Sequence, residues 1–160
     1  MDGNVPPESG ALRNPRIVIA DDFETLRRGL RSLLGSAVCG EAKNGQEAIQ
    51  RVLELRPNLV ILDWTMPVMS GLEALKAIRS LAPETKILVF SLHSEDAVKE
   101  EALRAGADAF LHKTTTGDTI LKTIAALLPG MSLLDSATHT QNARPSSTTA
   151  SHKLGFANKS

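Results

Sequence analysis

The chain has 160 residues, 42% of them hydrophobic but only 3% aromatic, and its 18 basic and 18 acidic side chains give a formal net charge of zero. This length fits one domain with a mainly aliphatic core, and the balanced charge provides no global basic field for nucleic acid. The single cysteine, Cys39, excludes an intramolecular disulfide framework. We interpret it as an ordinary small apolar residue in a strand.

The first residues of the chain are expected to form a flexible leader over 1–14, because two prolines and two glycines interrupt them. They contain neither the basic region nor the apolar region of a signal peptide. No apolar stretch approaches the roughly 20 residues that a membrane-spanning helix needs. We therefore expect a cytoplasmic protein that does not bind membranes.

From residue 16 onwards, short apolar runs alternate with longer amphipathic segments. The pattern predicts strands at 16–20, 37–42, 59–63, 86–91 and 107–112, and helices at 23–34, 44–55, 72–81, 95–105 and 116–128. Asn44 is a candidate cap of the second helix, and Thr116 or Asp118 opens the last one. Near-continuous apolar strands between helices predict an α/β fold with a doubly wound, five-stranded parallel sheet.

The composition changes again near the end of the chain. Half of the residues from Ser136 to Ser151 are Ser or Thr, and few are charged. Such a segment cannot bury enough apolar surface to offset the entropy of ordering it. We therefore expect a domain at 15–130 and a disordered tail at 131–160. A passive tail is favoured over an interaction segment anchored by Phe156.

Acidic residues follow two of the predicted strands. Asp21 and Asp22 come directly after the first strand, and Asp63 ends the third. If these strands are neighbours in the sheet, three carboxylates share one crevice, where like charges raise each other's pKa values unless a cation neutralises them. An all-oxygen cluster without Cys or His suits a hard ion such as Mg²⁺. The sequence thus predicts a site for phosphate chemistry.

Ser91 and Lys113 end the fourth and fifth strands, so they reach the same edge of the sheet. Asp63 can act as a nucleophile toward a phosphoryl group and form an acyl phosphate. The Lys113 ammonium and Mg²⁺ would offset the charge of the phosphoryl oxygens. The Ser91 hydroxyl can donate a hydrogen bond to one of these oxygens.

The expected ligands of Mg²⁺ are oxygen atoms from the ends of the first and third strands. Asp22 and Asp63 can each supply a carboxylate oxygen, and the backbone carbonyl of Thr65 could supply a third ligand. Asp21 is expected to act through water or as an acceptor behind the other ligands.

Four parts of the chain carry a family resemblance: Asp21–Asp22, residues 63–73 (DWTMPVMSGLE), Ser91, and residues 106–113 (GADAFLHK). Ser91 lies 28 residues after Asp63, and Lys113 lies 22 residues after Ser91. In this order and spacing, the chain resembles the receiver domain of two-component response regulators over residues 15–128. The resemblance implies a flavodoxin-like sheet of order 2-1-3-4-5.

The resemblance also implies the role of each residue. Asp63 would accept a phosphoryl group from a sensor histidine kinase or a phosphotransfer protein, in a reaction that depends on Mg²⁺. Ser91 would be the switch hydroxyl and Lys113 the lysine that pairs with the phosphate. Phe110 matches the aromatic switch position, although a plain core role is equally expected from the residue alone.

A receiver of this kind is a signalling switch and not an enzyme, with intrinsic phosphoryl-transfer and slow dephosphorylation chemistry. Its output surface would lie on the fourth helix, the fifth strand and the fifth helix, and would include Val98, Glu101, Phe110 and Lys122. The downstream protein target is unknown. A monomer or a phosphorylation-dependent dimer is expected.

Two positions depart from the common receiver pattern. Thr114 follows Lys113 where many receivers have proline, and Leu92 follows Ser91 where a small residue is common, so water could attack the phosphate more slowly. Both variations resemble receivers of the LuxR/NarL type. Those proteins carry a helix-turn-helix after the receiver, and none is evident in this chain, so direct DNA binding is not expected.

Two alternative functions remain open at this point. The chain could be the receiver portion of a transcription factor lacking its helix-turn-helix. It could also be a phosphatase of the haloacid dehalogenase-like type, although those enzymes need a second Asp two residues after the nucleophile, where this chain has Thr65.

Three further residues near the predicted site have no assigned chemistry. His93 and His112 lack metal-ligand spacing with other donors, so we interpret them as surface or strand-edge residues. Trp64, the only tryptophan, could either cover the site or lie exposed beside it.

Overall fold

The computed structural model describes residues 13–133. Most of the expected leader and tail therefore lies outside the described residues. Strands and α-helices alternate along the described chain in the order β1 (Ile17–Ala20), α1 (Glu24–Leu34), β2 (Val38–Ala42), α2 (Gly45–Leu55), β3 (Leu59–Asp63), α3 (Gly71–Leu81), β4 (Lys86–Ser91), α4 (Asp96–Arg104), β5 (Ala109–His112) and α5 (Gly117–Leu127). A short 3₁₀ helix, Gly35–Ala37, joins α1 to β2.

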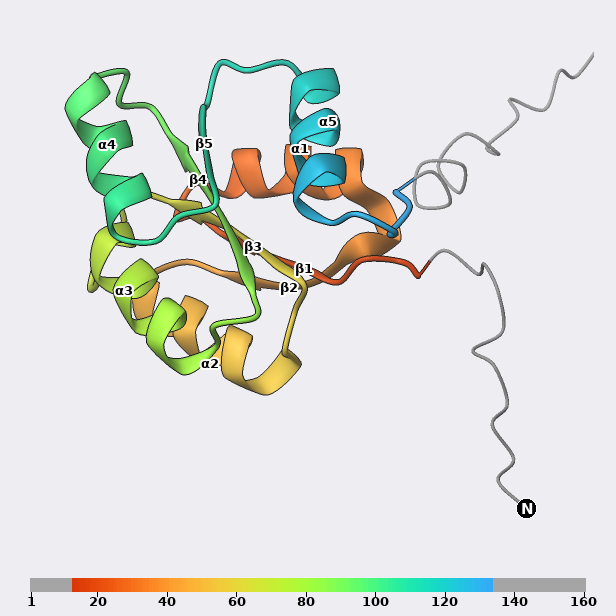
Figure 1. Cartoon of the computed structure of the whole chain (residues 1–160), viewed down its shortest axis with the longest axis horizontal. Coiled ribbons are helices and arrows are strands. Elements are labelled where there is room, and N and C mark those ends of the chain that lie inside the picture. Colours follow the sequence, from red (N-terminus) through yellow and green to blue (C-terminus); the bar gives the residue numbers. More distant parts are fainter. Residues whose placement is uncertain (1–12, 134–160) are drawn as a thin grey trace, which may run out of the picture.

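The five strands form one parallel sheet in the order β2-β1-β3-β4-β5, which confirms the predicted α/β fold and strand order. Helices α1 and α5 cover one face of this sheet, and α2, α3 and α4 cover the other (Figure 1). Strand β2 lies on one side of β1, and β3 lies on the other, followed by β4 and β5. The strand order therefore reverses at β1, and the carboxyl ends of β1 and β3 flank this topological switch point. Ligands of open parallel sheets bind at this position.

The core has two halves, one on each face of the sheet. Alternate residues of β1, β3 and β4 pack against α1 and α5 on one side and against α2, α3 and α4 on the other. Strand β3 is buried along its whole length, including Asp63 at its end. Because both faces are covered, the central strands are apolar throughout, as parallel sheets require.

Several element boundaries differ from the predicted ones by one or two residues. Strand β5 begins at Ala109 instead of 107, because the Asp108 carboxylate, rather than a strand partner, accepts the Ile87 amide hydrogen at 2.8 Å. Helix α3 begins at Gly71, and Ser70 caps it in a reciprocal capping box with Glu73. Asn44 caps α2 as predicted, and Thr116, one of the two candidates, caps α5; each accepts a backbone N–H of the first turn.

The two ends of the described chain lie side by side. Arg13 and Met131 form an isolated parallel bridge, and the Ser132 amide donates to the Arg13 carbonyl. Met131 and Leu133 pack against the core half that contains α5. The folded unit therefore includes residues just outside the expected 15–130 range.

Cys39 lies in β2 at a register shift, where Val38 and Gly40 have partner residues in β1 and Cys39 has none. It is half-buried against the core, and burial raises the pKa of its thiol. These features confirm its interpretation as a small apolar residue of a strand. Over residues 13–133, no helix has both the length and the apolar character needed to cross a bilayer.

Candidate functional site

The strand register brings the two acidic segments together. Ala20 of β1 lies opposite Leu62 of β3, so Asp21 follows directly beside Asp63 at the same edge of the sheet. One carboxylate oxygen from each of Asp21, Asp22 and Asp63 lies within 4.8 Å of the others. Asp21 and Asp63 are buried, with 2% and 4% of their surface exposed, whereas Asp22 faces solvent.

The Lys113 ammonium joins the two buried carboxylates. Its Nζ lies 2.6 Å from Asp21 Oδ2 and 3.2 Å from Asp63 Oδ1, and all three side chains are largely shielded from water. Burial, and next the charge of Asp21, raise the pKa of Asp63 to about 6, although the Lys113 charge and hydrogen bond oppose the rise. The Asp63 carboxyl therefore titrates close to neutral pH in the metal-free protein.

Three hydrogen bonds fix Asp21 in this cluster. Its amide donates to the Ala42 carbonyl of β2, and its Oδ1 accepts the Phe23 amide at 2.9 Å. The guanidinium of Arg27, a buried residue of α1, donates to the Asp21 carbonyl at 2.8 Å. Because Oδ1 accepts the Phe23 amide just before α1 and Oδ2 pairs with Lys113, Asp21 is already held on both carboxylate oxygens.

The edge strand β2 helps to hold the Arg27 side chain in place. Its Nε lies 3.5 Å from Glu41 of β2, which also pairs with Arg31 at 3.1 Å. This contact links α1 and the edge strand to the backbone that carries Asp21. Apolar patterning on α1 predicts Arg27, with Arg28 and Arg31, on the solvent side. For Arg27 this prediction is wrong, because its side chain is buried and donates to a backbone carbonyl.

The loop after β3 is packed tightly against Asp63. Gly71 donates its amide to the Trp64 carbonyl, and a Cβ at Gly71 would overlap the backbone of Asp63 and Trp64. Glycine is therefore required where α3 begins. Trp64 is half-buried against the core, and Thr65, which is exposed, donates its amide to Asp63 Oδ1 at 3.3 Å.

Ser91 ends β4, and Phe110 lies within the neighbouring strand β5. Ser91 is fully buried at the end of β4, and its Oγ accepts the His93 amide at 3.0 Å. Phe110 pairs with Val89 in the sheet and is half-buried on the face that α2, α3 and α4 cover. Ser91 thus lies at the edge of the sheet that carries the carboxylates, whereas Phe110 lies two residues before the end of its strand.

Sequence reasoning missed the contacts of the two histidines. The His93 Nε2 lies 3.1 Å from the Thr65 hydroxyl and so joins the turn after β4 to the turn after β3. The His112 ring contacts Leu92 and Thr114, which follow Ser91 and Lys113. The only available signal was proximity in sequence, since each histidine is within two residues of a predicted site residue.

A cavity of about 650 Å³ opens above the carboxylates. Asp22, Asp63, Thr65 and Lys113 form its polar part, and Phe23, Leu26, Leu92 and His93 complete its lining. Leu92 is largely exposed at this mouth. A small phosphodonor or a protein side chain has space to approach Asp63 here.

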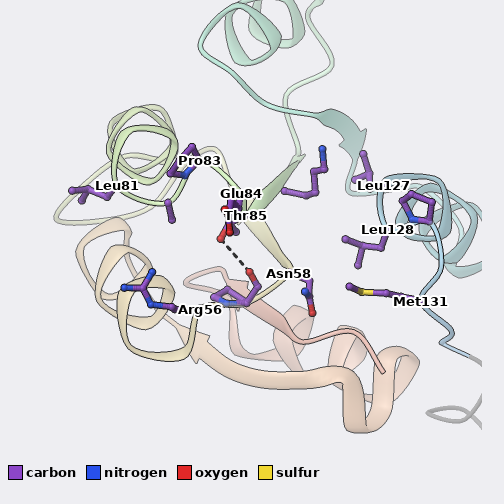
Figure 2. Close-up of a pocket in the computed structure, with 13 residues that line it drawn as sticks. Arg56, Asn58, Leu81, Pro83, Glu84, Thr85, Leu127, Leu128 and Met131 are labelled. Atoms are coloured by element: carbon purple, nitrogen blue, oxygen red, sulfur yellow. Dashed lines mark hydrogen bonds between the residues drawn. The ribbon is translucent and has the colours of Figure 1, made fainter. Parts of the chain in front are cut away.

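A second cavity, of about 500 Å³, lies at the opposite end of the strands (Figure 2). Asn58, Thr85 and Met131 are among its lining residues, and the Thr85 hydroxyl donates to the Pro57 carbonyl at its wall. None of the predicted site residues lines it. The residues of the predicted site therefore all lie away from this second cavity.

The donor set fits a hard divalent cation. The ligand atoms of the cluster are carboxylate oxygens, two of them on buried side chains whose charge is only partly offset by one ammonium. The raised pKa of Asp63 reflects a local excess of negative charge and burial that a cation would relieve.

Comparison with known proteins gives the family. The family model described as the response regulator receiver domain matches residues 17–125. The chain is 39% identical to the transcriptional regulatory protein LnrK of Bacillus subtilis over 72% of this chain and 54% of that protein. It is 41% identical to the chemotaxis protein CheY of Thermotoga maritima over 61% of this chain and 84% of that protein.

The nitrate/nitrite response regulator NarL of Escherichia coli is 38% identical over 76% of this chain and 58% of its own length. The chain thus spans little more than half of the length of these transcriptional regulators. Among solved structures, the receiver domain of NarL from Mycobacterium tuberculosis aligns with a TM-score of 0.66 and 35% identity, over 71% of this chain and 95% of that one.

These comparisons support no relationship to haloacid dehalogenase-like phosphatases. The chain belongs to the response regulator receiver domain family of two-component systems, and NarL/LuxR-type regulators are among its relatives.

Proposed function

We propose that this receiver acts as a signalling switch and that Asp63 is the residue on which it is phosphorylated. Receiver domains interact with histidine kinases and phosphotransfer proteins, and such a protein would be the donor here. The observation that carries the proposal is the cluster of three carboxylates with the Lys113 ammonium bridging Asp21 and Asp63. Its cavity gives a donor access to Asp63.

In the proposed reaction, an Asp63 carboxylate oxygen attacks the phosphorus of a phosphohistidine. The new P–O bond makes an acyl phosphate, the P–N bond breaks, and the electron pair stays on the imidazole nitrogen, which takes up a proton. A bound Mg²⁺ ion would neutralise charge on the phosphoryl oxygens. Asp22, Asp63 and the Thr65 carbonyl are the proposed ligands, with Asp21 acting through water.

Lys113 and Ser91 are the proposed contacts of the new phosphoryl group. The Lys113 ammonium already lies against Asp63 and can pair with a phosphoryl oxygen. The Ser91 hydroxyl, which accepts only the His93 amide among the contacts of the described chain, keeps its hydrogen to donate to the phosphate. Phe110 would then change its packing, and Lys113→Ala should uncouple phosphorylation from that change.

Trp64 supplies the test, because it adjoins Asp63 and is the only tryptophan. Its fluorescence should change when Mg²⁺ is added and change again when beryllofluoride, a phosphoryl mimic, is added with Mg²⁺. Asp63→Asn should lose the second response. An unaltered beryllofluoride response in Asp63→Asn would place the phosphoryl site elsewhere.

A second candidate is the receiver portion of a longer transcription factor. It is favoured by the similarity to LnrK and NarL, of which the chain spans only 54% and 58%. The receiver chemistry would be the same, but the output would pass to a DNA-binding domain. A reading frame that continues past Ser160 into a helix-turn-helix would support this candidate, and a stop codon there would contradict it.

A further inference from the structure

The His112 side chain joins two turns that flank the proposed switch residues. His112 ends β5 and pairs in register with Ser91, which ends β4. Beyond this pair, the Lys113 amide donates to the Ser91 carbonyl at 2.8 Å. The next residues, Leu92 and Thr114, belong to the turns that lead into α4 and α5, and the His112 ring contacts both of them.

The contacts of the ring fix its tautomer. Nε2 lies 2.8 Å from the Leu92 carbonyl, which can only accept, so Nε2 must carry the hydrogen. In the neutral ring Nδ1 is then an acceptor. It lies 2.6 Å from the Thr114 hydroxyl and accepts the Thr114 amide at 3.3 Å. The ring thus donates to one turn and accepts from the other.

The His112 side chain thus joins the turn that begins with Leu92 (the Ser91 turn) to the turn that begins with Thr114 (the Lys113 turn). Its hydrogen bonds involve neither the carboxylates nor the Lys113 side chain. A displacement of the Leu92 carbonyl must either break the Nε2 bond or carry the ring with it. A ring that moves pulls on Thr114, next to Lys113. The backbone bond between Lys113 and Ser91 alone leaves both turns beyond it free to move separately.

We propose that His112 is a positioning residue that makes the Ser91 turn and the Lys113 turn respond to phosphorylation as one unit. The inference rests on the proposed function, since it concerns the same site. It assigns no chemical step to His112. The ring sets the relative position of the two groups that would contact the phosphoryl oxygens.

The two ring nitrogens allow a matched set of variants. His112→Gln places an amide donor near the position of Nε2 and can keep the Leu92 bond. His112→Asn places an amide oxygen near the position of Nδ1 and can keep the Thr114 bond. His112→Leu removes both bonds. Because Gln and Asn each preserve one bond, at least one of them should fold stably enough for the measurement.

The measurement is NMR of the uniformly ¹⁵N-labelled 160-residue chain. Ring nitrogen shifts of the wild type should show the neutral Nε2–H tautomer. During a beryllofluoride titration with Mg²⁺, the amides of Leu92 and Thr114 should respond at one rate. In all three variants these two rates should differ by at least about fivefold, because at least one of the two bonds that join the turns is lost.

Two readouts separate coupling from general stability. The Mg²⁺ affinity reported by Trp64 should stay within about twofold of the wild type, since His112 contacts none of the carboxylates. Thr123→Val, which removes a hydroxyl bond to the Thr119 carbonyl on the surface of α5, is the control and should leave the two rates equal.

Equal rates at Leu92 and Thr114 in the folded variants, with a normal beryllofluoride response, would overturn the role of His112 and leave the proposed function intact. The Nε2-unprotonated tautomer in the wild type would overturn it as well. A wild type without any Asp63-dependent response would contradict both proposals.

Discussion

At the scale of single residues, the site is governed by a charge imbalance. Two buried carboxylates, Asp21 and Asp63, share one ammonium, Lys113, while Asp22 adds a third acidic group from the solvent side. Burial and the nearby Asp21 raise the pKa of Asp63 to about 6. The excess of negative charge therefore destabilises the metal-free protein, and a divalent cation would relieve the imbalance.

The raised pKa of Asp63 predicts a pH dependence of stability. The folded state binds the Asp63 proton more tightly than the unfolded chain does, so ionisation of Asp63 destabilises the fold. This cost is absent below about pH 4, grows between the unfolded and folded pKa values, and is complete above about pH 6. After allowance for solvent screening, we expect about 1–2 kcal/mol.

Urea unfolding of the wild type and of Asp63→Asn without metal ions measures this cost. Asp63→Asn should gain stability relative to the wild type as the pH rises from about 4 to about 7, because only the wild type ionises there. Asp118→Asn, on the exposed surface of α5, controls for the loss of a remote carboxylate. A wild-type-minus-variant difference that does not change with pH would contradict the raised pKa.

The bridging position of Lys113 predicts how the fold responds to its removal. Lys113→Ala leaves two buried carboxylates without their cation and should destabilise the metal-free protein by about 2–4 kcal/mol. Excess Mg²⁺ should recover much of this loss, because no ammonium competes with it for Asp21 and Asp63. Thermal unfolding with a chelator and with Mg²⁺ measures both effects.

The control for this prediction is Lys122→Ala, which breaks an exposed pair with Asp118 on α5. It should change stability little, with or without Mg²⁺. If Mg²⁺ stabilised Lys113→Ala no more than it stabilises the wild type, the ammonium and the metal would not share the same carboxylates.

At the scale of elements, the loop between β3 and α3 is the most constrained segment of the site. Gly71 permits the close approach to the Asp63 backbone, and Ser70 and Glu73 cap α3. The same loop holds Val68 at a φ of 68°, although 79% of this side chain is exposed. A β-branched residue in the left-handed region is strained, and little buried contact offsets the strain.

Replacement of Val68 by Asn should therefore stabilise the protein by about 1 kcal/mol, since Asn tolerates the left-handed region. Val68→Ala keeps a Cβ and should gain less, which makes it the matched control. Denaturant unfolding gives both values. A destabilised Val68→Asn would mean that the valine makes a contact that outweighs its backbone strain.

The elements themselves were largely predictable from sequence periodicity, and the reasons for the errors are specific. Strand β5 starts two residues later than predicted because a side chain, Asp108, replaces a backbone partner of β4. The contacts of Arg27 with Glu41 and of His112 with Leu92 were not predictable, because each reaches an element that is distant in sequence. Apolar patterning reports which face of a helix is buried, and it does not report side-chain hydrogen bonds between elements.

At the scale of the whole molecule, the strand order explains why four separate segments supply one site. With β1 and β3 adjacent and β4 and β5 beside them, the residues after each strand meet at a single edge (Figure 1). The sequence predicted this edge because each polar residue directly follows an apolar run. The opposite edge carries the second cavity, the paired ends of the described chain and none of the predicted chemistry.

The central claim is that Asp63 accepts the phosphoryl group in a reaction that depends on a divalent ion. Mass spectrometry of the chain after incubation with acetyl phosphate tests it most directly. With Mg²⁺, the wild type should carry one phosphoryl adduct that maps to the peptide containing Asp63, and it should carry none when a chelator replaces Mg²⁺. Asp63→Asn should carry none in either case. An adduct that persists in Asp63→Asn, or a wild type that never acquires one, would contradict the claim.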